Sequence, residues 1–125
     1  MAKSFLLIGS LYGLLGVVLG AFGAHALRAR LSEDLLRAWQ TGVEYQFYHA
    51  FALLLLGGLI HSGAVAGAWS SAAGWCFALG VLLFSGSLYG LALGGPRLLG
   101  PVTPLGGLFL IIGWGCLVVA LLRTQ

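Results

Sequence analysis

The sequence predicts an all-α membrane protein with four transmembrane helices in a bundle, and three observations lead to this fold class. Hydrophobic residues make up 60% of the 125 residues and charged residues only 7%, whereas about a quarter of the residues in an ordinary soluble domain are charged. The mean hydropathy is +1.04. A soluble protein of this composition would expose large apolar patches and aggregate, so lipid is the solvent that suits this chain.

The third observation is a set of four long apolar runs, at residues 4–24, 42–60, 72–93 and 103–122. A hydrocarbon core about 30 Å thick needs about 20 apolar residues per helical span. None of the runs contains lysine or arginine. A transmembrane barrel would show alternation over segments of about 10 residues instead. We therefore expect a single transmembrane domain over residues 1–125.

The first run also has features of a secretory signal peptide, because Lys3 precedes it and Ala24-His25-Ala26 resembles a cleavage site. The apolar part of a signal peptide is usually about 7–15 residues long, which is shorter than this run. We expect a retained helix.

The stretch between residues 21 and 49 holds six of the nine charged residues. Ser32 is a candidate N-cap, and Glu33 and Asp34 would follow it in the first turn, where the helix dipole favours acids. Apolar and polar residues then alternate with helical spacing. The pattern predicts an amphipathic interfacial helix over residues 32–41, with Trp39 at headgroup depth. This helix could run directly into the second span, with Thr41-Gly42 as a bend.

The net charge of +3 is small and dispersed, which argues against nucleic-acid binding. Basic residues are more numerous in the first and third loops than at the termini. The positive-inside rule would place those two loops in the cytoplasm. If Arg28 or Arg97 pairs within the protein, this bias disappears, so the orientation stays open.

Glycines form a ladder along the first span, with spacings of four, three, four and three residues: Gly9, Gly13, Gly16, Gly20 and Gly23. This spacing places them on one helix face, where small residues let a neighbouring backbone approach closely. Gly86 and Gly90 are spaced similarly in the third span. We expect these faces to contact a neighbouring helix, either in the same chain or in another copy.

Several separated motifs resemble one family. They are Gly20-Ala-Phe-Gly-Ala-His25, Trp39-Gln-Thr-Gly-Val-Glu-Tyr-Gln46 with His49, Phe84-Ser-Gly-Ser-Leu-Tyr89, and Thr103-Pro-Leu-Gly-Gly with Gly113-Trp114. The chain resembles a domain-of-unknown-function family of small integral membrane proteins, typified by the bacterial proteins YgdD and YwdK. The resemblance covers nearly the whole chain. It implies a multi-pass plasma-membrane protein and implies no established activity.

Ionisable residues near the ends of the first two spans form the candidate site. His25 ends the first span and Glu44 begins the second, so both are expected near one membrane face, and His49 lies about 7.5 Å deeper than Glu44. An ionisable group within a membrane is a functional-site hypothesis by default. The candidate polar cluster comprises His25, Arg28, Glu44, Tyr45, Tyr48 and His49.

Two interpretations of this cluster compete. In the favoured one, Glu44 pairs with Arg28 or His25 and clamps the first loop to the bundle. In the other, the cluster binds a small polar ligand, a lipid headgroup or a proton, for which histidine is suited because its charge changes near neutral pH. Two histidines and a glutamate could also bind zinc, but no H-x-x-H or C-x-x-C spacing supports a metal site, and a haem would need His25 and His49 to face each other.

The sequence predicts neither a catalytic residue nor a cofactor, because the common catalytic motifs are absent. The favoured function is an accessory or scaffold protein that interacts with membrane lipids, and that forms a homo-oligomer or joins a larger membrane complex. The alternative is an oligomeric transporter or channel with a proton or ligand site at Glu44 and the histidines. A membrane enzyme is the least favoured.

Overall fold

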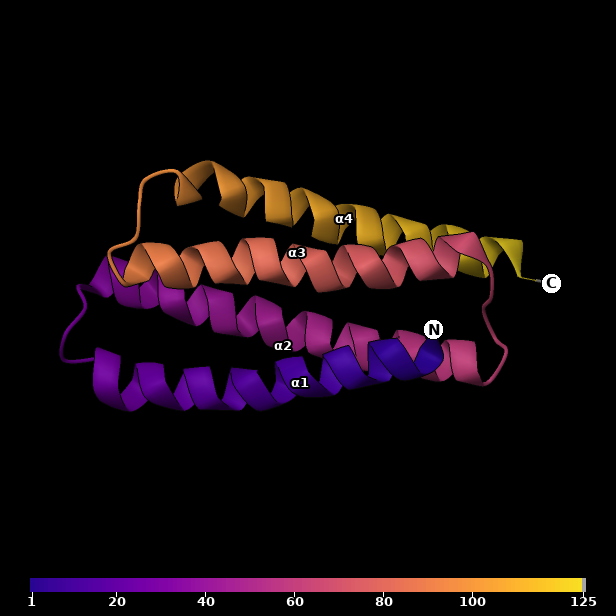
Figure 1. The fold of residues 1–125 in the computed structure, drawn as a ribbon, viewed down its shortest axis with the longest axis horizontal. Coiled ribbons are helices and arrows are strands. Elements are labelled where there is room, and N and C mark those ends of the chain that lie inside the picture. Colours follow the sequence, from indigo (N-terminus) through magenta and orange to yellow (C-terminus); the bar gives the residue numbers. More distant parts are fainter. Residues whose placement is uncertain (125) are drawn as a thin grey trace.

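The computed structural model describes residues 1–124, which form four long helices joined by short connections (Figure 1). Helix α1 covers Ala2–Phe22 and continues into a π-helical turn, Gly23–Leu27. Helix α2 covers Glu33–His61, α3 covers Ala68–Ala92, and α4 covers Leu99–Arg123. Both chain ends lie at the same end of the molecule as the connection between α2 and α3 (Figure 1).

All four helices are long and apolar enough to cross a membrane, counting α1 together with its π-helical turn. The two shorter ones have 25 residues each, which corresponds to a length of about 37 Å at about 1.5 Å per residue. This length exceeds the hydrocarbon core of about 30 Å. The prediction of an all-α protein with four membrane-spanning helices is confirmed.

The separate interfacial helix predicted for residues 32–41 is wrong. The start signal is present, because Ser32 is the N-cap of α2 and its Oγ accepts a hydrogen bond from the backbone N–H of Leu35 at 3.3 Å. However, α2 runs from this cap through residues 41 and 42 as one helix. The predicted amphipathic segment is therefore the first part of the second spanning helix.

Tertiary packing of the first turns of α2 explains why no bend occurs. Trp39 is only 2% exposed, so it is a core residue and not the headgroup anchor that the sequence suggested. Gly42 is buried against α3, where a Cβ would lie 2.7 Å from the ring of Tyr89. The hydroxyl of Ser85 also donates a hydrogen bond to the Gly42 carbonyl at 2.6 Å. These contacts hold the start of α2 against both neighbouring helices.

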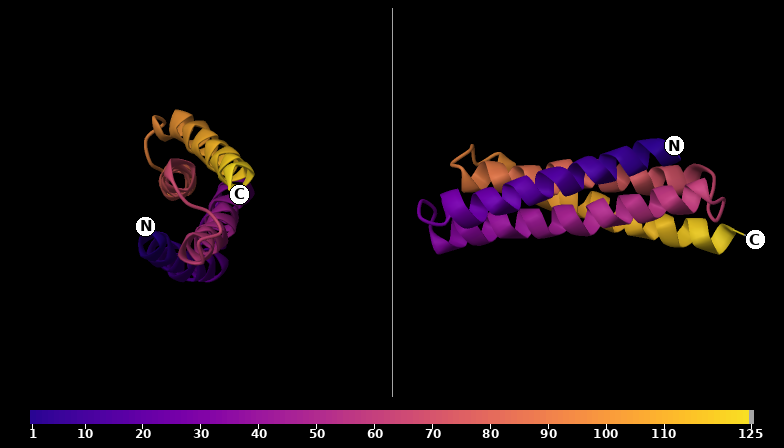
Figure 2. Two further views of the ribbon diagram at one scale, coloured as in Figure 1. Left: turned by 90° about the vertical axis from the view of Figure 1, so that its right-hand side faces the viewer. Right: turned by 90° about the horizontal axis from the view of Figure 1, so that it is seen from below.

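The four helices form an open zig-zag and not a closed square bundle (Figure 2, left). Helix α2 packs between α1 and α3, and α3 packs between α2 and α4. Helix α1 touches α3 only slightly, and the backbones of α2 and α4 stay apart. Lateral grooves therefore run between α1 and α3 and between α2 and α4.

Of the glycines predicted to pack, four lie in the contact between α1 and α2: Gly9, Gly16, Gly20 and Gly23. Their neighbours on α2 include Ala50, Phe47, Val43 and Trp39. Gly90 lies against Leu99 at the start of α4. Gly13 and Gly86 have no such neighbour within 4 Å in this chain, so a packing contact at these two positions stays a prediction for another copy.

Helices α3 and α4 approach each other closely at Gly106. At Gly106, an added Cβ would overlap the backbone of Phe84. Near one end of the contact, the hydroxyls of Ser87 and Thr103 form a hydrogen bond at 2.5 Å. Glycine thus lets two antiparallel helices meet at backbone distance, as in other membrane bundles.

Candidate functional site

The end of α1 and the start of α2 are joined by a tryptophan. The indole Nε1–H of Trp39 donates a hydrogen bond to the Leu19 carbonyl at 2.9 Å. A Cβ at Gly23 would lie 2.6 Å from the Trp39 ring, so only glycine leaves room for the indole. The π-helical turn begins at this glycine. This arrangement accounts for two of the motifs that carried the family resemblance, one around Gly23 and one beginning at Trp39.

The six residues of the predicted polar cluster do not form one cluster. His25 and Arg28 are exposed beyond the end of α1. Glu44 and Tyr48 are exposed on the outer face of α2, and Tyr45 is 38% exposed. Only His49 is buried, at 4% exposure.

The expected ion pair that would clamp Glu44 is not formed. Within residues 1–124, the single ion pair joins Asp34 and Arg37 at 3.6 Å, and both of its side chains are exposed. Glu44 therefore has neither Arg28 nor His25 as a partner. Exposed pairs of this kind contribute little stability, so the charges of the first loop do not fasten the helices together.

His49 fastens α2 to α4. The indole Nε1–H of Trp114 donates to His49 Nε2 at 3.0 Å, and the other ring nitrogen, Nδ1, lies 2.8 Å from the Tyr45 carbonyl. Because an indole can only donate, Nε2 must be the acceptor. We assign the proton to Nδ1, which donates to the carbonyl, so the ring is the neutral tautomer.

This bonding leaves His49 no free nitrogen for a metal or a haem iron. Within residues 1–124, no group of three histidine, cysteine, aspartate or glutamate side chains is placed to hold a metal ion. His25 is exposed at the end of α1 and does not join His49. The zinc and haem alternatives that the sequence left open therefore have no geometric support.

The groove between α2 and α4 has aromatic walls. It encloses about 330 Å³ and is lined by Tyr45, His49, Phe84, Gly107, Leu110, Ile111 and Trp114. The rings of Tyr45 and Phe84 pack with centroids 4.6 Å apart, and those of His49 and Trp114 are 5.9 Å apart. Tyr45 thus packs beside a groove, which explains its partial exposure.

A further groove lies at the contact between α1 and α2, and we call it the α1/α2 groove. It encloses about 310 Å³ and is lined by Gly20, Gly23, Ala24, Trp39, Gln40, Val43 and Glu44. Gly20 of α1 and Gly23 and Ala24 of the π-helical turn form one wall. Gln40 and Glu44, one turn apart on α2, lie on the other wall. Glu44 is the charged residue of the predicted polar cluster that lines this groove. The other grooves within residues 1–124 that we describe have no charged residue in their walls.

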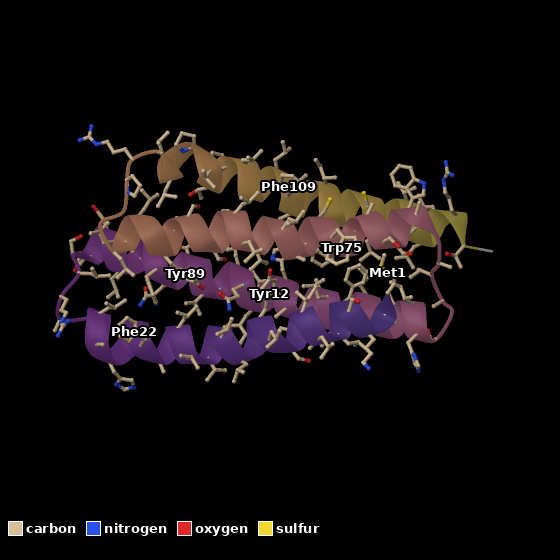
Figure 3. All side chains as sticks on the ribbon, viewed as in Figure 1. Met1, Tyr12, Phe22, Trp75, Tyr89 and Phe109 are labelled. Carbon is tan, nitrogen blue, oxygen red and sulfur yellow. The ribbon has the colours of Figure 1, made fainter. Side chains whose placement is uncertain are left out.

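A buried hydrogen-bond network joins α1, α2 and α3, and the sequence analysis missed it. The Gln46 side chain donates through Nε2 to the Tyr12 carbonyl at 2.8 Å and accepts through Oε1 from the Tyr89 hydroxyl at 2.7 Å. The Tyr12 hydroxyl donates to the Ala78 carbonyl of α3 at 2.6 Å, and both tyrosines are labelled in Figure 3. The available signal was Gln46 itself, an amide inside a predicted membrane span.

The fold and these contacts define a small multi-pass membrane protein made of four spanning helices. Its residues 19–107 match the family model described as "Protein of unknown function (DUF423)". The chain belongs to this family, as the motifs around Gly23, Trp39 and Tyr89 suggested.

Relatives cover almost the whole chain. A UPF0382 membrane protein of Staphylococcus epidermidis is 42% identical over 121 residues, which is 97% of each chain. The UPF0382 membrane protein YwdK of Bacillus subtilis is 42% identical over 121 residues, 97% of this chain and 98% of its own. A UPF0382 membrane protein of Staphylococcus haemolyticus is 42% identical over 118 residues, 94% of each chain. No solved structure matches this chain.

Proposed function

We propose that this chain is a non-conducting accessory protein of the bacterial plasma membrane that works by contacting neighbours sideways within the bilayer. Its partners in this proposal are membrane lipids and the spanning helices of other proteins, in a larger membrane complex or in an oligomer. The proposal assigns it neither a catalytic residue nor a cofactor.

The observation that carries this proposal is that the buried polar side chains are all paired. Within residues 1–124, every buried side-chain nitrogen or oxygen has a hydrogen-bond partner. Gln46, His49 and Ser85 are all engaged with neighbouring helices. A conducting path needs polar groups that line water and that exchange partners with the transported species. Here the interior polar groups join helices instead.

The experiment is a flux measurement on purified protein in liposomes. Liposomes with the wild-type protein should show proton and small-solute fluxes equal to those of empty liposomes. The same result is expected for Glu44→Gln. Flux above the empty-liposome level that disappears in Glu44→Gln would overturn the accessory role and support transport.

One observation supports the alternative of an oligomeric transporter. Glu44 faces outward from α2, so several copies that surround an axis with this face inward would place a ring of carboxylates in a central pore. Such rings give cation selectivity in channels. The liposome experiment decides between the two functions, provided that it is performed at protein densities that allow oligomers to form.

A further inference from the structure

We propose that Glu44 and the α1/α2 groove bind a transmembrane helix of a different membrane protein, one that presents a lysine or arginine side chain to the Glu44 carboxylate. This inference rests on the proposed accessory function and names the chemistry of its partner. The starting point is a carboxylate that lies within a spanning helix, faces outward and has no ion pair within residues 1–124.

The first step concerns the depth of Glu44. We place the hydrocarbon-spanning part of α2 between its polar residues Arg37 and His61, which are about 36 Å apart along a helix that rises about 1.5 Å per residue. A core about 30 Å thick, centred on this part, begins about 3 Å inside Arg37. Glu44 is about 10 Å from Arg37 along the axis, so its backbone lies about 7 Å inside the hydrocarbon.

The second step is the cost of leaving this carboxylate in lipid. Side chains on a helix lean toward its N-terminus, so the carboxylate of Glu44 leans toward Gln40 and the nearer interface. Even so, an ionised group at this depth is unfavourable unless it is paired or hydrated. Glu44 carries the only formal charge within the four apolar runs, and it has no ion pair within residues 1–124, so it calls for an external partner.

The third step is the shape beside Glu44. The far wall of the groove is formed by Gly20, Gly23 and Ala24, which have little or no side chain. Trp39 covers Gly23 and Val43 lies beside Gly20. The part of this wall that is open to a second helix is therefore at Ala24, whose small side chain permits a close approach. A helix seated there would bring its own side chains next to the carboxylate, and Gln40 one turn away offers a further hydrogen bond.

The fourth step excludes a second copy of this chain as the source of the cation. All six lysine and arginine residues lie at helix ends or in loops. Gly20 of α1 lies beside Val43, and Ser85 of α3 is hydrogen-bonded to Gly42. Residues near Gly20 and Ser85 therefore lie at about the same depth as Glu44. The large side chains exposed near that depth are apolar, for example Val18 and Leu82. A copy in the same orientation would therefore offer no positive charge at the depth of Glu44, whereas a different protein can place one there.

The test uses a designed helix in vesicles of phosphatidylcholine, which has no N–H donor in its headgroup. The probe is a leucine-rich helix of about 20 residues with two lysines placed symmetrically, so that either orientation presents one at the depth of Glu44. The control helix has leucine at both positions. Association with the labelled full-length protein is measured by energy transfer as the helix concentration rises.

We expect the lysine helix to associate about tenfold more tightly than the leucine helix, which is the effect of one interhelical hydrogen bond in lipid. This preference should disappear in Glu44→Gln and persist in Glu33→Gln, which makes the same change at an exposed acid outside the span. Ala24→Leu should weaken binding by filling the groove. Ala21→Leu, on an exposed part of α1 that does not line the groove, should not.

Equal association of the two helices, or a lysine preference that survives Glu44→Gln, would overturn the proposal. Two further outcomes would replace the partner. Retention of phosphatidylethanolamine by wild-type protein but not by Glu44→Gln, without lysine-helix binding, would assign the site to a lipid amine. Loss of self-association in Glu44→Gln would assign it to a second copy. None of these outcomes depends on flux, so the accessory function stands or falls separately.

Discussion

Replacing Gly106 with alanine tests the close contact between α3 and α4. The added methyl would meet the backbone nitrogen and Cα of Phe84, and backbone atoms inside a helix cannot rotate away as a side chain can. Overpacking of this kind costs about 1–3 kcal/mol. Removing glycine from a helix interior returns about 1 kcal/mol through helix propensity. We therefore expect Gly106→Ala to lower the free energy of unfolding by about 1 kcal/mol, with α4 displaced from α3.

The matched control is Gly115→Ala in the same helix, where no atom of a neighbouring helix lies within 4 Å. Because the propensity gain is shared, the difference between the two variants isolates the overpacking cost of about 2 kcal/mol. Reversible unfolding in mixed micelles with increasing dodecyl sulfate, followed by tryptophan fluorescence, measures both free energies. Equal stabilities would refute the close approach of α3 and α4 at this point.

Three other predictions concern polar groups. A double-mutant cycle of Trp114→Phe and His49→Leu should give a coupling energy of about 0.6–1.7 kcal/mol in the same unfolding assay, and a coupling near zero would contradict the α2–α4 hydrogen bond. Gln46→Leu should cost about 1–3 kcal/mol because it leaves the half-buried Tyr89 hydroxyl without its acceptor, and adding Tyr89→Phe should restore part of that loss. Glu44→Gln should leave the free energy of unfolding within about 0.5 kcal/mol of wild type, as for a surface position, whereas a clear loss of stability would revive the clamp between the first loop and α2.

The four spanning helices could be predicted from the sequence because lipid imposes a simple length and composition rule. The start of α2 was also readable, since Ser32 followed by two acids is a strong N-terminal signal. The wrong prediction concerned residues 32–41, where the helical spacing of apolar residues fits either an interfacial helix or the start of a packed spanning helix. An apolar face can rest on lipid or pack on another helix, and only the contacts of Trp39 and Gly42 show that packing prevails.

The candidate site was harder to predict, because neighbours on one helix do not determine which residues meet across helices. Glu44 and His49 are near in sequence, yet Glu44 borders the α1/α2 groove and His49 borders the groove between α2 and α4. The partner of His49, Trp114, is 65 positions away in the chain. The sequence could indicate that His49 was unusual but not that an indole would satisfy it. The amide of Gln46 within a predicted span also indicated a hydrogen bond to another helix, which we did not predict.

The contrast between Gln46 and Glu44 carries the main physical argument about function. Both lie within the same spanning helix two residues apart, and lipid penalises an unpaired polar group at either position. The fold satisfies Gln46 completely, with donors and acceptors on two other helices. It leaves Glu44 facing outward beside a wall of small residues, with no ion pair within residues 1–124. This chain forms internal partners for its buried polar groups, and the cationic helix that we propose would supply the missing partner of the outward carboxylate.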